Sequence, residues 1–109
     1  AWLRGEAARC FQSLADRLYP AVGRLGAARP SISVRAMRTR WGSCNARSAR
    51  ISLSLALFRA PIELVEYVVL HELAHLLHPD HQAGFRDFMT AQMPDWRARR
   101  ARLHREPTQ

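Results

Sequence analysis

One short motif, H-E-x-x-H, constrains this chain most, because it places three polar side chains within an otherwise apolar segment. His71 and His75 are four residues apart, so in a helix their rings share one face and can hold one metal ion. Burying both rings together with Glu72 is costly unless each is satisfied, and a metal site satisfies all three. The surrounding apolar residues predict a largely buried helix: Ile62, Val65, Val68, Val69, Leu70, Leu73, Ala74, Leu76 and Leu77.

Zinc is the metal that this pattern favours. Neutral imidazole is a preferred zinc ligand, and a catalytic zinc usually has three protein ligands and one water. Glu72, between the two histidines, is placed to accept a proton from that water. The alternative is a core helix whose histidines are only hydrogen-bonded. Pro61 is expected to open the helix and Pro79 to close it.

The third ligand has four candidates by position: Cys44, His78, Asp80 and His81. His78 is seven residues from His71, which is about 10 Å along a helix axis and too far for one ion. A turn at Pro79 and Asp80 would return His81 towards the two helical histidines. The spacing of His81 also matches that of metzincin ligands. We therefore predict His81 as the third ligand.

Two further side chains near the motif have alternative roles. Cys44 is the rival third ligand, since peptide deformylases use a cysteine upstream of the same motif, but we expect an inert packed thiol. His78 is interpreted as a cap of the helix C-terminus or as a group that supports a ligand.

The remaining chain predicts an α+β domain, with helices around a small antiparallel pair of strands. A peptide substrate could add to the strand 51–57. The elements predicted besides the metal helix are helix 2–19, strands 31–40 and 51–57, and helices 82–92 and 96–104.

Charge and composition point to anionic partners. The 109 residues include 17 basic and 9 acidic side chains, a net charge of +8, and every basic side chain is arginine. Two cysteines, Cys10 and Cys44, do not make a disulfide framework, which favours a reducing cytoplasm. No apolar run is long enough to cross a membrane, so we expect no membrane partner.

Three other side chains are candidates for substrate binding. Arg38 and Arg40 belong to the predicted strand pair, which should border the cleft, and they could hold substrate or phosphate groups. Tyr67 lies one turn before His71 and could donate to an oxyanion, although packing is the commoner fate. We interpret the arginines of the last helix mainly as a solvated face: Arg97, Arg99, Arg100, Arg102 and Arg105.

Three separated segments resemble the YgjP-like metallopeptidases, relatives of the SprT-like and WLM zinc proteases: Arg40-Trp-Gly-Ser-Cys44, Tyr67-Val-Val-Leu-His-Glu-Leu-Ala-His75 and His78-x-x-His81-x-x-x-Phe85. The resemblance covers about residues 35–103. It implies a minimal zincin domain, with zinc on His71, His75 and His81 and with Glu72 as general base. The sequence departs from the family at Arg86, where tryptophan commonly follows Phe85.

These observations predict a zinc-dependent metallopeptidase that hydrolyses peptide bonds and acts on DNA-associated proteins, as SprT-like relatives do. One alternative is a nucleic-acid-binding module with a structural zinc, and it requires a fourth ligand. Another is a deformylase-like zinc amidase, and it requires Cys44. We expect residues 1–109 to form one metallopeptidase domain, the C-terminal catalytic part of a longer protein, because family members carry further N-terminal sequence.

Overall fold

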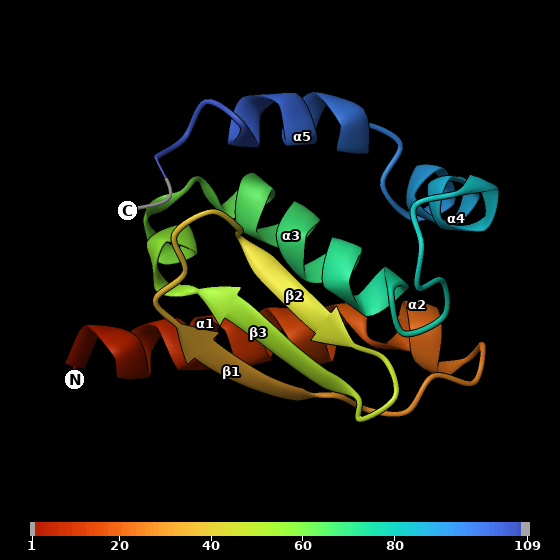
Figure 1. The fold of residues 1–109 in the computed structure, drawn as a ribbon, viewed down its shortest axis with the longest axis horizontal. Helices are drawn as coiled ribbons and strands as arrows, with labels where there is room; N and C mark the ends of the chain where they lie inside the picture. Colours follow the sequence, from red (N-terminus) through yellow and green to blue (C-terminus); the bar gives the residue numbers. More distant parts are fainter. Residues whose placement is uncertain (1, 108–109) are drawn as a thin grey trace.

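The helix that carries the H-E-x-x-H motif, α3, lies between a small sheet and the C-terminal helix (Figure 1). The computed structural model describes residues 2–107. The predicted α+β class is confirmed. The elements are α1 (Trp2–Leu18), α2 (Pro20–Gly23), β1 (Ser31–Arg35), β2 (Gly42–Asn45), β3 (Arg50–Ser54), the 3-10 helix η1 (Leu55–Arg59), α3 (Ile62–Ala74), α4 (Ala83–Gln92) and α5 (Trp96–Leu103).

The sheet is mixed, with strand order β1-β3-β2, and the predicted antiparallel pairing of the two strands 31–40 and 51–57 was wrong. β1 pairs with β3 in parallel, Val34 opposite Leu53, whereas the antiparallel partner of β3 is β2, with Gly42 opposite Leu53. β2 lies between the two predicted strands and was not predicted, because its residues, Gly-Ser-Cys-Asn, have little intrinsic strand preference. Tertiary pairing with β3 makes it a strand.

Both predicted strands are shorter than expected. β1 ends at Arg35 rather than at residue 40, and β3 ends at Ser54 rather than at residue 57. The Ser54 hydroxyl accepts a hydrogen bond from the backbone N–H of Ala56 at 3.3 Å, which starts the 3-10 helix η1. β3 is paired along both edges, so a peptide cannot add to it.

α3 is apolar around most of its circumference because it is covered on several sides. α1 and the sheet pack on one side, and α5 lies on the opposite side, away from the sheet (Figure 1). Pro61 precedes the first turn, as predicted, but α3 ends at Ala74, well before Pro79. The backbone N–H of Leu76 bonds to the Leu73 carbonyl at 3.0 Å, so a tight i→i+3 turn ends the helix instead.

α5 is fixed against α3 by an arginine and a tryptophan. The Arg99 guanidinium donates to the backbone carbonyl of Glu63 at 3.0 Å and to the carboxylate of Glu66 at 3.3 Å. Trp96 is buried, and its indole N–H donates to the Thr90 hydroxyl of α4 at 3.0 Å. The C-terminal helix is thus packed firmly against the core.

No helix within residues 2–107 is long and apolar enough to cross a membrane.

Candidate metal centre

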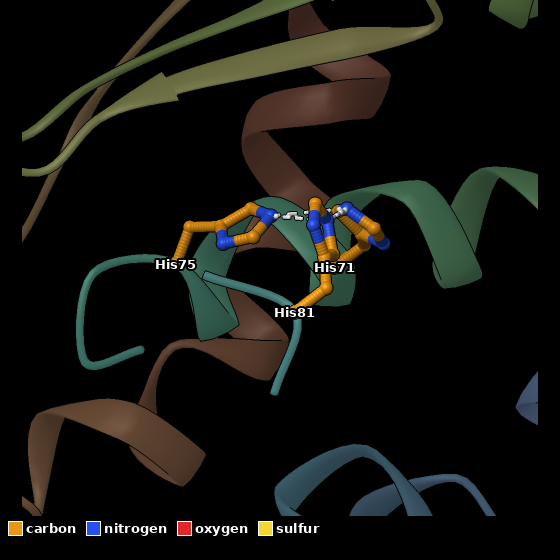
Figure 2. A group of neighbouring side chains, drawn as sticks. All are labelled: His71, His75 and His81. Atoms are coloured by element: carbon orange, nitrogen blue, oxygen red, sulfur yellow. Dashed lines mark hydrogen bonds between the residues drawn. The ribbon is translucent and has the colours of Figure 1, made fainter. Parts of the chain in front are cut away.

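Three histidine rings converge beside the end of α3 (Figure 2). His71 and His75 come from the helix and its C-cap, and His81 comes from the loop before α4. Their Nε2 atoms form a nearly equilateral triangle with edges of 3.1, 3.1 and 3.2 Å. Tetrahedral zinc with Zn–N bonds of roughly 2.0–2.1 Å separates its ligand nitrogens by about 3.3 Å. The three atoms therefore match the spacing that a zinc site needs.

The second nitrogen of each helical ring has a partner that orients it. His75 Nδ1 donates to the backbone carbonyl of His78 at 2.9 Å. Its Nε2 is therefore unprotonated, and the lone pair of this atom is free to bind a metal. His71 Nδ1 lies 3.2 Å from the Tyr67 hydroxyl. Lone pairs that face one another at this distance repel unless a cation lies between them. The donor set therefore fits a metal ion.

Phe85 forms the floor beneath the three rings. Its ring centroid lies 5.0 Å from each of the three histidine centroids, and it stacks on His75 with an interplanar angle of 18°. Phe85 is 2% exposed, so it also excludes water from that side of the rings. In the sequence analysis this residue appears only in a motif of the family resemblance.

The loop that carries His81 is held by two polar contacts. The Asp80 carboxylate accepts the backbone N–H of Gln82 at 3.1 Å, which makes the predicted turn. The Arg86 guanidinium donates to the His81 backbone carbonyl at 3.0 Å. The departure from the family pattern at Arg86 therefore contributes a direct contact to the loop.

Electrostatics keep the helical histidines neutral. Burial lowers the pKa of His71 to about 3, with the charges of His75, His81 and then Arg100 acting in the same direction. Burial also lowers the pKa of His75, although the hydrogen bond to His78 opposes it. Neutral imidazole is the form that binds metal, so both rings are in the ligand state near neutral pH.

Glu72 is 5% exposed and lines a cavity together with His71 and His75. Burial raises the pKa of its carboxyl group to about 7, and the charge of Arg40 opposes this rise. The backbone of Gly42 approaches closely, since a Cβ added there would lie 3.1 Å from both Cγ and Oε2 of Glu72. A proton acceptor with a pKa near the working pH suits general base chemistry.

Cys44 is a free thiol that lines a cavity next to the histidines but is not part of the metal-binding group. Burial, followed by the charge of Glu72, raises the pKa of its thiol to about 11. A thiol of this kind stays protonated at neutral pH when no metal is bound. Within residues 2–107, no fourth His, Cys, Asp or Glu joins the three histidines.

Two adjoining cavities open onto the site. The larger, about 570 Å³, extends between α3 and α5, and the smaller, about 360 Å³, extends along β2 past Cys44. Arg40 lines both, and Tyr67 lines the larger one with its hydroxyl at His71. Arg38 lines a separate cavity with Leu3 and Phe58. Of the three predicted substrate-binding residues, the structure therefore brings Arg40 and Tyr67 to the site and Arg38 to another surface.

The last helix contributes residues that the sequence analysis did not assign to the site. Arg97, Arg100 and His104 line the larger cavity, so the interpretation of α5 as mainly a solvated face was incomplete. Their spacing of three and four residues puts them on one helical face, and this is the signal that could have found them. Their position near the histidines depends on how α5 packs, which the spacing does not reveal.

An H-E-x-x-H helix, a third histidine from the following loop and a small sheet beside them are the features of a zinc metallopeptidase. The chain belongs to the YgjP-like family, since it matches the family described as "YgjP-like, metallopeptidase domain" over residues 1–106. A search of curated proteins found no match.

Two solved structures share the fold. The metallopeptidase zymogen abylysin of Pyrococcus abyssi superposes with a TM-score of 0.74 and 20% identity, over 85% of this chain and 90% of that one. The metallopeptidase zymogen jannalysin of Methanocaldococcus jannaschii gives a TM-score of 0.71 and 14% identity, over 85% of this chain and 92% of that one. At these identities the likeness concerns the fold alone.

Proposed function

We propose that His71, His75 and His81 hold a catalytic zinc and that Glu72 moves the proton in peptide-bond hydrolysis. The observation that carries this proposal is the triangle of three Nε2 atoms with edges of 3.1–3.2 Å, with a buried carboxyl group beside it. The absence of a fourth ligand within residues 2–107 favours an open, catalytic site over a structural one.

The protein groups divide the work between binding and proton transfer. Zinc, when bound, supplies a Lewis acid that makes water acidic near neutral pH and polarises a carbonyl group. Glu72 accepts the proton from the attacking water and returns it to the leaving amine. The hydrogen bond from His75 to the His78 carbonyl fixes the orientation of its ring. Phe85 keeps water from the rear of the rings.

We propose that an extended peptide adds to the free edge of β2 rather than to β3. Within residues 2–107, β2 pairs with β3 along one side only. Its residues Gly42, Ser43 and Cys44 line the cavity that His71 and Glu72 also line. Backbone hydrogen bonds to a strand edge hold a peptide with little regard to its side chains. A carbonyl group of that peptide would then lie next to the histidines.

The test compares cleavage of an unfolded protein by the parent and by Glu72→Gln at equal zinc content. We expect the variant to keep zinc and fold but to lose on the order of a hundred- to ten-thousandfold in rate, because proton transfer is removed. Glu6→Gln, at a half-buried position of α1 outside all three cavities, is the matched control and should cleave like the parent. Equal cleavage by the parent and Glu72→Gln, independent of zinc, would contradict the proposal.

The finer proposal is that DNA-associated proteins are among the substrates. The net charge of +8, carried by arginine alone, supports it because such a surface favours polyanions. Cleavage of a DNA-binding protein should therefore rise when DNA is added at low salt, and this gain should vanish as salt increases. Cleavage that is unchanged by DNA at every salt concentration would remove this part of the proposal.

A cytoplasmic location also remains a proposal. Cys10 and Cys44 are both free thiols in the structure, which is compatible with a reducing compartment. Fractionation of cells followed by immunodetection would test it.

A further inference from the structure

Three arginines line the larger cavity. Arg40 precedes β2, and Arg97 and Arg100 belong to α5. Within residues 2–107, none of these three forms an ion pair with a carboxylate. Five other arginines do: Arg9, Arg17, Arg29, Arg99 and Arg102.

The two arginines of α5 are held by a buried aromatic ring. The guanidinium carbons of Arg97 and Arg100 lie 4.3 and 5.2 Å from the Trp96 ring centre, within the range of cation–π contact. Trp96 is 2% exposed and is itself anchored by the hydrogen bond to Thr90. Stacking uses the face of a guanidinium group and leaves its N–H edge free to donate. The Trp96 ring therefore orients the guanidinium groups of Arg97 and Arg100 and leaves their N–H groups available to an anion.

These arginines line one cavity together with the reactive groups His71 and Glu72. His104 also lines the cavity, and among residues 2–107 Glu72 is the only lining residue with a carboxyl group. The cavity therefore attracts anions and repels basic groups.

We propose that this cavity selects peptides that present a carboxylate next to the scissile bond, either an Asp or Glu side chain or the C-terminal carboxylate. The inference rests on the proposed peptidase function and names its substrate class. Arginine forks match a carboxylate with two parallel hydrogen bonds. A volume of about 570 Å³, continuous with His71 and Glu72, places such a carboxylate beside the reacting carbonyl.

A peptide carboxylate fits this cavity better than a nucleic acid does. Recognition of single-stranded nucleic acid relies on exposed aromatic rings on which bases stack. Trp96 is buried and carries two arginines on its ring, and Trp41 is half-buried against the core. Trp41 is thus the partly exposed tryptophan of this cavity, beside three arginines, so charge rather than base stacking is the main feature of the cavity.

The test measures binding of four N-acetylated peptides to zinc-loaded Glu72→Gln by calorimetry, so that cleavage does not interfere. The peptides share one sequence and carry either Glu or Gln at one position, each as a free acid and as a C-terminal amide. We expect the charged peptides to bind about tenfold more tightly than the Gln amide, as expected for a hydrogen bond to a charged group. Tighter binding of the Glu amide would identify the side-chain carboxylate as the group that the cavity recognises. Tighter binding of the Gln acid would identify the C-terminal carboxylate.

Variants then locate the preference. Arg40→Gln, Arg97→Gln and Arg100→Gln, each added to Glu72→Gln, should reduce it several-fold. The matched control is Arg24→Gln, which removes an equal charge from an exposed position outside all three cavities and should leave the preference intact. Equal binding of all four peptides would overturn the inference, as would an equal effect of Arg24→Gln and Arg100→Gln.

Two further results separate the inference from the proposed function. Binding of an oligothymidylate that depends on Arg97 and Arg100, with no binding of the peptides, would overturn the inference in favour of nucleic acid. Cleavage of Glu- and Gln-containing peptides by the parent at equal rates, together with equal binding, would overturn the inference and leave the peptidase intact. A carboxylate preference in binding without any cleavage by the parent would instead count against the proposed function alone.

Discussion

The helices α3 and α5 pack against each other and line the same cavity, yet their sequences revealed their roles very differently. α3 is apolar apart from a few positions, so the polar residues His71 and Glu72 stood out against it. α5 is rich in arginine, so Arg97 and Arg100 looked like ordinary solvent-facing charges. A polar group in a buried segment needs a specific reason, whereas a charged face needs none until its surroundings are known. The functional residues of α3 could therefore be predicted from the sequence, whereas those of α5 could not.

The largest effects are expected in the histidines at the end of α3. His71→Ala, His75→Ala and His81→Ala should each abolish tight binding of about one zinc per chain, because two remaining ligands form an incomplete site. His78→Ala is the matched control: its backbone carbonyl, which orients His75, remains. Metal analysis after dialysis measures the outcome. Loss of zinc from His78→Ala but not from His81→Ala would show that the third ligand is wrong.

The stability of the metal-free chain should depend on pH in opposite ways through two neighbours on α3. Burial raises the pKa of Glu72 from 4.5 to about 7, so the folded chain holds a proton on Glu72 in a pH range where the unfolded chain has lost it. The free energy of unfolding therefore falls as pH rises through that range. Burial lowers the pKa of His71 from 6.5 to about 3, so in this range the unfolded chain binds a proton that the folded chain does not. The free energy of unfolding therefore rises with pH between these two values.

The substitution Glu72→Gln removes only the first of these two contributions. Relative to the parent, the metal-free variant should therefore gain up to roughly 3 kcal/mol between pH 4.5 and 7. Urea unfolding in a chelating buffer measures this difference, and Glu6→Gln is the control. Stability curves of the parent and Glu72→Gln that run parallel across this range would show that Glu72 has an ordinary pKa.

Tyr67→Phe tests an intermediate effect on α3. Its hydroxyl lies 3.2 Å from His71 Nδ1, and losing a group that orients a ligand typically weakens metal binding about ten- to a hundredfold. Competition with a chromogenic chelator gives the affinity. An unchanged zinc affinity with a slower turnover would instead favour the predicted role of Tyr67 as an oxyanion donor.

The smallest effect is expected where α5 is fastened to α3. Arg99→Gln should cost about 1 kcal/mol of folding free energy, because its contacts with Glu63 and Glu66 are partly buried, and it should leave zinc affinity unchanged. Arg102→Gln, whose ion pair with Glu63 spans 3.8 Å and is more exposed, is the matched control with almost no cost. An equal cost for both would mean that Arg99 does not anchor the helix.

The sequence was informative where patterns are local. Helical periodicity predicted the long helices to within a few residues, and the spacing of His71, His75 and His81 predicted the convergence that the structure contains. Their role as ligands stays a prediction. The resemblance indicated the YgjP-like family, and the family comparison confirms it.

Non-local pairing and packing could not be predicted in the same way. The segment of β2 becomes a strand only through its pairing with β3. β1 pairs with β3 in parallel, although β2 lies between them in the sequence. Arg38 and Arg40 are two residues apart and line different cavities, because the chain bends after β1. Such placements depend on tertiary contacts rather than on the residues themselves.

The central claim, an open zinc site with three histidine ligands, is tested most directly by X-ray absorption at the zinc edge of the loaded protein. The account predicts imidazole scattering from three ligands at roughly 2.0–2.1 Å with one further oxygen, and no sulfur. The spectrum should be the same for Cys44→Ser. A sulfur ligand near 2.3 Å that disappears in Cys44→Ser, or a fourth protein ligand, would contradict the claim.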